Sequence, residues 1–516
     1  MSNVFKNCID KTQPILVTGA TGYVGGRLVP KLLEAGYQVR AVGRSLSKLN
    51  SRPWANHPAV QLMEMDVFSP ASVQNALTGC QAAYYLIHSM NPDQANYAQA
   101  DREAARLFSK FAKVAGVKRL IYLSGLGEDA PGFSKHLQSR AEVAHILQAG
   151  GVPATVFRAG IIIGSGSASF EILRYLVDRL PVMITPRWVD SKTQPIAVRN
   201  VLHYLVHCLE TPETTGQTYD IGGPDVLTYK ELMQTYARVA GHRIHLIVPV
   251  PVFTPKLSSY WIHLITPVSS AIAQPLAEGL RNDTICGDFS IQNLIPQTLL
   301  SCEQAIEKAL EKTRMNQVET HWTDSGVLSH PEQVYPGDPS WSGGTVYKDS
   351  RKIKVAASPN ELWSFIVKIG GETGWYYGNL LWQIRGLMDL IFGGVGLHRG
   401  RKHPTELRPG DALDFWRVLD VLPEEKLRLI AEMKVPGDAY LEFSLSQAEP
   451  HVSENFSSVS NQTEITQTAW FIPKGLPGIL YWYSVMPLHH FVFNGMLTGI
   501  AKAGRHPIVS APVILE

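Results

Sequence analysis

Three glycines separated by two residues each lie near the N-terminus, directly after a short apolar run. Gly19, Gly22 and Gly25 follow the Ile-Leu-Val of residues 15–17 and precede an apolar pattern typical of a helix. A first glycine permits a sharp turn, a second lets backbone N–H groups approach a phosphate, and a third lets helix and strand pack closely. The spacing therefore predicts a strand, turn and helix that bind the pyrophosphate of a dinucleotide.

The choice of dinucleotide should be encoded after the second strand, where an acidic residue would bind the ribose 2′-hydroxyl of NAD. That strand instead ends at Arg44, with Lys48 four residues later. A guanidinium can bind a 2′-phosphate through two parallel hydrogen bonds. We therefore expect NADPH to be preferred over NAD; the alternative is an ordinary solvated basic loop.

Other cofactor contacts follow from topology, because ligands of parallel sheets lie at the carboxyl ends of the strands. Asp66 and Val67 close the third predicted strand and would border the adenine, and His88 closes the fourth on the nicotinamide side. The complete set of predicted cofactor contacts is Gly19, Thr21, Gly22, Tyr23, Val24, Gly25, Arg44, Lys48, Asp66, Val67 and His88.

The composition narrows the class of protein. A chain of 516 residues exceeds one ordinary domain, and 45% apolar with 18% charged residues is typical of globular proteins. The net charge of +2 gives no reason to expect a nucleic-acid partner. The five cysteines are scattered without a CxxC pair, so we expect neither a disulfide framework nor a metal site, but the reduced thiols of a cytoplasmic protein.

Two long, weakly charged segments, residues 246–280 and 475–497, are rich in Trp, Tyr and Pro. Such segments could touch a membrane surface. We expect no segment that spans a bilayer, which takes roughly 20 consecutive, mostly apolar residues, and the N-terminus lacks the apolar core of a signal peptide. We therefore expect both segments to be buried within the fold rather than to contact a membrane.

Short β-rich runs alternate with amphipathic segments from residue 14 onward. Strands are predicted near residues 15–18, 38–43, 60–65, 82–87, 119–124 and 154–163, and helices near 23–35, 94–115 and 134–149. This alternation predicts an α/β domain over residues 12–314, a doubly wound parallel sheet of the Rossmann type. Pro30 lies inside the first helix, where it should remove a hydrogen bond to Gly26 and introduce a kink.

A second domain is predicted over residues 343–508, after a polar, Pro/Gly-rich linker at 315–342. Ser358, Pro359 and Glu361 form the signature of a helix start. Four alternating strands follow near residues 412–421, 426–434, 439–446 and 464–472, and a last helix near 486–503. This order predicts an α+β domain in which a curved antiparallel sheet grips a long helix.

These motifs together resemble a known superfamily. TGATGYVG, Arg44 after the second strand, YYLIHSM, YLSGLG, FRAGIIIG and YDIGGP are similar to the short-chain dehydrogenases/reductases, and more narrowly to their atypical, epimerase-like and NmrA-like branch. This resemblance covers about residues 14–310. The tail, with GDALDFWRV and QTAWFIPKGLPGILYWY, resembles a domain of unknown function related to START-like helix-grip folds.

The catalytic pattern departs from the one that the resemblance implies. Short-chain dehydrogenases use a serine with a Tyr-x-x-x-Lys pair, in which the tyrosine exchanges a proton with the substrate oxygen. Ser124 matches the serine, but His136 stands in place of the tyrosine and Arg140 in place of the lysine. Histidine can still transfer a proton near neutral pH, whereas arginine cannot titrate. Ser124, His136 and Arg140 are the predicted catalytic residues; mere surface or ribose contacts are the alternative for the latter two.

Three functions fit these residues. The first is an NADP(H)-dependent oxidoreductase that transfers a hydride to or from a small, apolar carbonyl or alcohol substrate. The second is a non-catalytic redox sensor of the NmrA-like kind, which the missing Tyr and Lys favour. The third is a nucleotide-sugar epimerase or dehydratase. Substrate identity and oligomeric state do not follow from the residues.

Overall fold

The computed structural model of the chain describes residues 9–87, 97–127, 135–180, 182–242, 246–250, 282–315, 318–320, 346–397, 399–447, 462–473 and 475–515. The chain divides into two compact units, Met1–Ser325 and Gly326–Glu516. The division falls in the segment 315–342, for which the sequence predicts a linker. Each unit is described by itself.

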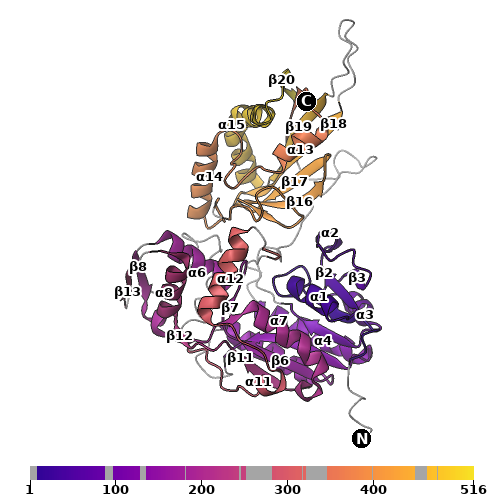
Figure 1. Cartoon of the computed structure of the whole chain (residues 1–516). Coiled ribbons are helices and arrows are strands. Elements are labelled where there is room, and N and C mark those ends of the chain that lie inside the picture. The colour runs from indigo at the N-terminus through magenta and orange to yellow at the C-terminus, as the bar shows by residue number, and fades with distance from the viewer. Residues whose placement is uncertain are drawn as a thin grey trace. The chain divides into compact units, whose positions relative to one another are not determined.

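A seven-stranded sheet forms the centre of the N-terminal unit (Figure 1). All its neighbouring strands run parallel. The order across the sheet is β3 (Val60–Glu64), β2 (Val39–Gly43), β1 (Ile15–Val17), β4 (Ala82–Tyr85), β5 (Arg119–Gly125), β6 (Ala154–Ala159) and β11 (Thr218–Ile221). This order confirms the doubly wound Rossmann sheet predicted from the alternating pattern.

Helices cover both faces of the sheet. Successive residues of β1 point to opposite faces, so Ile15 and Val17 enter one apolar core and Leu16 enters the other. The first core contains side chains of α1 (Gly25–Glu34) and α7 (Val198–His207). The second core contains side chains of α3 (Pro70–Leu77), α4 (Tyr97–Val114) and α5 (Lys135–Ala149). Continuous apolar strands such as β1 result from this two-sided burial.

The strand expected over residues 154–163 is interrupted, which corrects the prediction. After β6 the chain passes through Gly160, where a Cβ would overlap the carbonyl oxygen of Gln194. It then forms β7 (Ile162–Ile163), which pairs with β10 (Ile196–Ala197) in a separate small sheet. Beyond β7 a further apolar core joins α6 (Ala168–Arg179), α8 (Tyr229–Ala240) and α12 (Cys302–Arg314), and short strand pairs, β9 (Lys192–Thr193) with β12 (Leu227–Thr228) and β8 (Val182–Pro186) with β13 (Leu246–Val250), flank it.

Helix α1 continues through Pro30. Proline has no N–H, so the carbonyl of Gly26 loses the partner it would have four residues later. The indole Nε1–H of Trp54 donates to that carbonyl oxygen at 3.1 Å. A side chain from a distant loop thus replaces the missing helical hydrogen bond, because an unpaired buried carbonyl would cost free energy.

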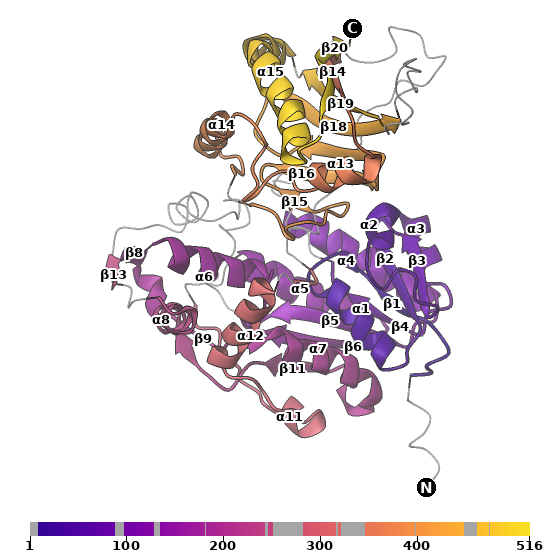
Figure 2. The same cartoon turned by 45° about the horizontal axis from the view of Figure 1, so that its top comes forward.

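An antiparallel sheet forms the C-terminal unit, in the order β15 (Ala412–Leu413), β16 (Trp416–Leu422), β17 (Lys426–Ala431), β18 (Gly437–Gln447), β19 (Thr463–Pro473), β14 (Tyr347–Val355) and β20 (Ile508–Leu515). Helices α13 (Pro359–Ile366), α14 (Asn379–Ile391) and α15 (Gly475–Ala503) accompany it (Figure 2). Val492, Met496 and Ile500 of α15 pack into the same core as Ile353 of β14. This is the predicted helix-grip arrangement.

Two features of this unit differ from the expectation and one agrees with it. The Ser358 hydroxyl accepts from the N–H of Glu361, and the Glu361 carboxylate accepts from the N–H of Ser358. The predicted capping box is therefore present. Helix α15 begins at Gly475, eleven residues before the predicted start. Strand β20 was not predicted; it extends the sheet beside β14.

Replacing Trp54 by phenylalanine keeps most of the aromatic volume but removes the donor to the Gly26 carbonyl. We expect Trp54→Phe to lower the free energy of unfolding of the N-terminal unit by about 1 kcal/mol, measured by urea denaturation. In a Pro30→Ala background the alanine N–H can reach Gly26, so the same change should cost less. An equal cost in both backgrounds would contradict this account.

Candidate functional site

The glycine loop joins β1 to α1 and has the shape that its spacing predicts. Gly19 has φ +62°, and a Cβ there would lie 2.9 Å from the carbonyl oxygen of Leu86. A Cβ on Gly25 would overlap the carbonyl oxygen of Gly19. At Gly22 the only neighbour of an added Cβ is that same oxygen, at 3.2 Å, so this position is otherwise open. Turn, open approach and close packing thus occur at the three predicted positions.

Thr18, which precedes the loop, fastens β1 to β4. Its hydroxyl donates to the carbonyl of Tyr84 at 2.9 Å and accepts from the N–H of Leu86 at 2.8 Å. Within the described residues, the N–H groups of Thr21, Tyr23 and Val24 donate to no backbone carbonyl. Backbone donors at the start of a helix are suited to an anion. The loop therefore fits a dinucleotide pyrophosphate. The hydrogen bonds of Thr18 were not predicted, because they depend on the neighbouring strand β4.

The side chain of Tyr23 points away from the open side of the loop, which narrows its predicted role. Burial raises the pKa of Tyr23 to about 12, and its hydroxyl occupies the place where a Cβ of Gly164 would stand. The guanidinium of Arg27 lies over the ring, 4.6 Å from its centre. Tyr23 can therefore contribute its N–H group to a cofactor but not its side chain.

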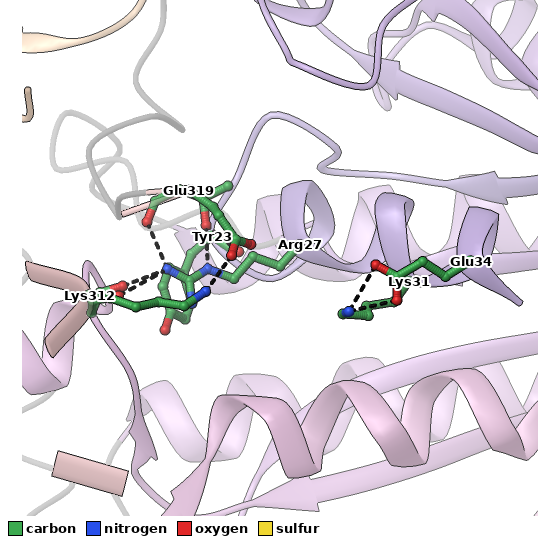
Figure 3. A network of polar contacts seen from close by, with 8 residues as sticks. Tyr23, Arg27, Lys31, Glu34, Lys312 and Glu319 are labelled. Atoms are coloured by element: carbon green, nitrogen blue, oxygen red, sulfur yellow. Dashed lines mark hydrogen bonds and ion pairs between the residues drawn. The ribbon is translucent and has the colours of Figure 1, made fainter. Parts of the chain in front are cut away.

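Arg27 connects the loop to distant segments (Figure 3). Its Nη2 donates to the carbonyl of Ser165 at 2.7 Å, and its Nε donates to the hydroxyl of Thr320 at 2.8 Å. The same hydroxyl donates to the carbonyl of Tyr23 at 2.8 Å. Beside Thr320, Glu319 forms an ion pair with Lys312 at the end of α12. Thr320, near the end of the N-terminal unit, therefore stabilises the loop through hydrogen bonds to Arg27 and to the carbonyl of Tyr23.

At the end of β2 the two predicted cations differ. Arg44 is exposed directly after the strand, as the proposed phosphate contact requires. Lys48 is 3% exposed, because Ser45 caps a short helix, α2 (Leu46–Asn50), that turns it inward. The prediction of Lys48 as an accessible partner is therefore corrected. Arg52, which the sequence reasoning missed, donates to the carbonyl of Thr21 at 2.7 Å and so braces the loop.

Asp66 and Val67 follow β3, the place expected for adenine contacts. Asp66 is exposed and its Oδ1 accepts from the N–H of Phe68 at 3.0 Å, which forms a turn before α3. Val67 is buried in the core beneath that turn. The predicted contact His88 lies outside the described residues. Arg44, Asp66 and the glycine loop all lie at the carboxyl ends of β1, β2 and β3.

The catalytic candidates Ser124 and Arg140 come together at the carboxyl end of β5. Arg140 in α5 runs beside Gly125, with its Cδ 3.7 Å from the place of an added Cβ, and its Nη1 donates weakly to the carbonyl of Leu123 at 3.5 Å. Ser124 is buried at the same strand end. His136 belongs to the first turn of α5, but its side chain lies outside what the structure describes.

A buried tyrosine, missed by the sequence reasoning, lies beneath Ser124. Burial raises the pKa of Tyr122 above its ordinary value, and the charge of Arg140 and a hydrogen bond with Ser124 oppose that rise. The carboxylate of Asp101 on α4 acts in the same direction as burial and accepts from the hydroxyl of Ser139 at 3.4 Å. Ser124 thus has two polar neighbours, Tyr122 of β5 and Arg140 of α5.

The remaining polar candidates have structural partners. Arg158 donates to Asp220 at 2.6 Å across β6 and β11, so its use is the salt bridge rather than the substrate cleft. Asp220 lies in β11 and also accepts from the N–H of Gly287. Asp225 caps α12 through the N–H of Cys302 at 2.6 Å. Among the described residues, no group of acidic, His or Cys side chains could hold a metal ion.

The aromatic side chains of the C-terminal unit mostly pack against one another. Trp375, Trp382, Phe415 and Trp416 have ring centres between 5.3 and 6.3 Å apart. Trp482 of α15 stacks on Tyr347 at 5.5 Å. Core packing therefore accounts for these rings.

The open side of Gly22 yields a test of nucleotide binding. An alanine there makes a tight contact with the Gly19 carbonyl oxygen, at 3.2 Å, which a shift of a few tenths of an ångström would relieve, and it places a methyl group where phosphate oxygens must approach. We expect Gly22→Ala to keep the circular dichroism spectrum and to weaken NADPH binding at least about tenfold by calorimetry, since charged hydrogen bonds are lost. Gly287→Ala, whose Cβ would have its nearest neighbour at an ordinary 3.7 Å, should leave the affinity unchanged. Undiminished binding by Gly22→Ala would rule out this loop as the phosphate site.

Comparison with known proteins agrees with this geometry. Residues 19–171 match a family described as NAD(P)H-binding, and residues 341–496 match a protein family of unknown function, DUF2867. The photosystem II assembly factor Ycf39 of Trieres chinensis is 24% identical over 249 residues, which are 48% of this chain and 74% of that protein. A (4-alkanoyl-5-oxo-2,5-dihydrofuran-3-yl)methyl phosphate reductase of Streptomyces griseus is 27% identical over 235 residues, 44% of this chain and 74% of the reductase.

Among solved structures, the NADP(H) complex of Citrobacter sp. triphenylmethane reductase aligns with a TM-score of 0.47 and 19% identity, covering 57% of this chain and 99% of that one. A nucleoside-diphosphate-sugar epimerase from Staphylococcus aureus aligns with a TM-score of 0.48 and 16% identity, covering 57% and 99%. The family matches and the glycine-loop geometry lead to one conclusion: a Rossmann domain that matches an NAD(P)H-binding family over residues 19–171 is joined to a domain that matches a family of unknown function over residues 341–496.

Proposed function

We propose that the protein is an NADPH-dependent oxidoreductase acting on a small, apolar carbonyl compound. The observation that carries this proposal is the shape of the glycine loop. The loop leaves room for a ligand at Gly22 and packs closely against the protein at Gly19 and Gly25. The same strand ends carry Ser124, at a position that the dehydrogenase resemblance assigns to a catalytic serine. A cofactor site and a polar group for substrate thus share one edge of the sheet.

Preference for NADPH is supported by charge at the end of β2. Arg44 is exposed there, and the residues that follow the strand, Arg44-Ser45-Leu46, include no acid that would select a free 2′-hydroxyl. Ser45 fixes the position of Arg44 by capping α2. A guanidinium at this place suits the dianionic 2′-phosphate through charge and geometry.

A reduced nicotinamide cofactor, when bound at the loop, supplies a hydride to a carbonyl carbon. In this proposal the Ser124 hydroxyl donates a hydrogen bond to the carbonyl oxygen and so stabilises the negative charge that develops there. His136, one helical turn before Arg140 in α5, delivers the proton that the oxygen takes up. Arg140 holds the strand end, because its guanidinium donates to the carbonyl of Leu123.

An apolar substrate is supported by the side chains around Ser124. Leu126 follows the strand and is buried, and Leu137 of α5 lies 3.2 Å from the place of a Cβ on Gly125. A carbonyl compound without charge fits such surroundings at the least desolvation cost.

A non-catalytic redox sensor is the second candidate, because Arg140 replaces the lysine of the usual pair and already bonds the backbone of β5. A sensor would bind NADPH without turnover and bias the affinity of a partner. An epimerase or dehydratase of nucleotide sugars would retain NAD tightly instead.

We also infer a cytoplasmic location. The described cysteines Cys80, Cys208, Cys286 and Cys302 are buried free thiols. Burial raises the pKa of Cys80 and Cys208 to about 11 and that of Cys286 and Cys302 to about 12. Protonated, buried thiols suit a reducing compartment and require no oxidant for folding.

The cofactor assignment is tested by removing Arg44. Arg44→Ala should weaken NADPH binding about ten- to a hundredfold and leave NADH binding nearly unchanged, because one or two charged hydrogen bonds to the 2′-phosphate are lost. Calorimetry measures both. Lys31→Ala removes an exposed cation of α1 that pairs with Glu34 and should change neither affinity. Equal weakening of NADPH and NADH by Arg44→Ala would refute the specificity argument.

The catalytic assignment is tested by turnover. With small aliphatic and aromatic carbonyl compounds as substrates, Ser124→Ala and His136→Ala should each lower the rate of NADPH oxidation by about a hundredfold or more, with cofactor affinity kept. Full activity in both variants would remove these residues from the mechanism. NADPH binding by the wild type without turnover of any carbonyl compound would favour the sensor.

A further inference from the structure

Helix α14 has its polarity reversed relative to an ordinary surface helix. Leu380, Ile384, Leu387 and Ile391 recur at helical spacing and are all exposed, Ile391 by 71%. The buried side carries Asp389 instead, which is 0% exposed. The Asp389 carboxylate accepts from the N–H of Lys434 at 2.6 Å and of Gly396 at 2.8 Å. An exposed apolar stripe of this kind marks an interaction surface.

The first half of α15 carries a second stripe of the same kind. Leu476, Leu480, Tyr483 and Phe491 lie on one side of the helix and are exposed. The expectation that residues 475–497 are buried is therefore wrong for the first half of this helix, while its second half enters the core. Most of the other flagged segment, residues 251–281, lies outside the described residues.

The two stripes belong to one surface. Gly378, before α14, lies 3.6 Å from Val492 measured from an added Cβ, and Arg385 lies over the ring of Tyr481 at 6.0 Å. These contacts bring the start and the middle of α14 against α15. We call their exposed side chains the α14–α15 face.

Charge distinguishes the occupants of this face. In residues 373–405 and 474–506, which carry the two helices, Asp389 is the only acidic residue, and it is buried. The cations of the same segments are Arg385, Arg399, Arg401, Lys402, Lys474, Lys502 and Arg505, of which Arg399 pairs with Glu432. A second copy of the chain would bring these cationic segments together without exposed acidic partners, which disfavours a symmetric dimer through the face.

The aromatic members of the face point to a lipid surface. Tyr377 and Tyr483 are about half exposed beside leucine and isoleucine side chains, and tyrosine combines an apolar ring with a polar tip suited to the headgroup region. Helices with an apolar side and cationic flanks lie in the interface of anionic bilayers. Within the described part of the chain, no helix has the length and apolar content to cross a membrane.

We propose that the α14–α15 face docks the protein on the surface of an anionic lipid bilayer, with the leucine, isoleucine and aromatic side chains inserted among the headgroups and the cations against lipid phosphate. This proposal is independent of the oxidoreductase assignment, because it uses only residues of the C-terminal unit.

Flotation of the full chain with vesicles tests the proposal. Wild type should float with vesicles containing about one third phosphatidylglycerol in phosphatidylcholine, and more weakly with phosphatidylcholine alone or at high salt. The double variant Leu387→Gln/Ile391→Gln should reduce partitioning at least about tenfold, because it removes apolar area that would enter the bilayer. Val114→Gln/Phe289→Gln, which changes exposed apolar residues of the N-terminal unit, should float like wild type.

Circular dichroism and thermal unfolding establish that each variant keeps its fold, as exposed positions predict. The proposal is overturned if wild type floats with neither vesicle, or if Leu387→Gln/Ile391→Gln floats as well as wild type. Light scattering adds one more outcome. A wild-type dimer that this double variant converts to a monomer, without vesicle binding, would assign the face to a second copy and overturn the lipid proposal.

Discussion

The close approach of α1 to the glycine loop is the constraint on which the nucleotide site depends. Because a Cβ on Gly25 would overlap the carbonyl oxygen of Gly19, the helix can start only if both positions lack side chains. That approach directs the first N–H groups of α1 toward the open side at Gly22. Several distant residues then hold the loop by its backbone: Thr18 through β4, Arg52 through the carbonyl of Thr21, and Thr320 through the carbonyl of Tyr23. These hydrogen bonds order the loop before a ligand binds. Binding therefore costs less conformational entropy.

The parts of the fold that follow from local pattern could be predicted, and those that depend on distant partners could not. Two-sided apolar runs such as β1 and the capping box at Ser358 are readable in a few residues. The replacement of a helical hydrogen bond by Trp54 joins residues 28 positions apart, and no periodicity records it. The break after β6 likewise depends on how closely Gly160 approaches Gln194. Strand β20 exists because it pairs with β14, more than 150 residues earlier in the sequence.

The candidate site follows the same division. The glycines and Arg44 were found because their roles depend on backbone shape and on position after a strand. Lys48 was misplaced because Ser45 starts a short helix, and one turn of helix reverses the direction in which a side chain points. The salt bridge of Arg158 could not be predicted, because only the pairing of β6 with β11 brings Asp220 to it. The contact of Tyr122 with Ser124 was not predicted, because Tyr122 lies in an apolar strand. Such a strand does not indicate that the tyrosine hydroxyl forms a hydrogen bond with Ser124.

Helix α14 shows why periodicity alone does not determine which side of a helix faces the core. Its apolar stripe is regular, and the usual inference would bury it. A buried, unpaired carboxylate would cost more than the exposure of several leucines. In α14 the Asp389 carboxylate is not left unpaired, because it accepts hydrogen bonds from the backbone N–H groups of Gly396 and Lys434. Leu390 is buried on the same side, and Gly386 lets Leu397 approach the helix closely. The satisfied carboxylate and these close contacts together favour the observed orientation of α14, which leaves the leucines and isoleucines of its other side exposed.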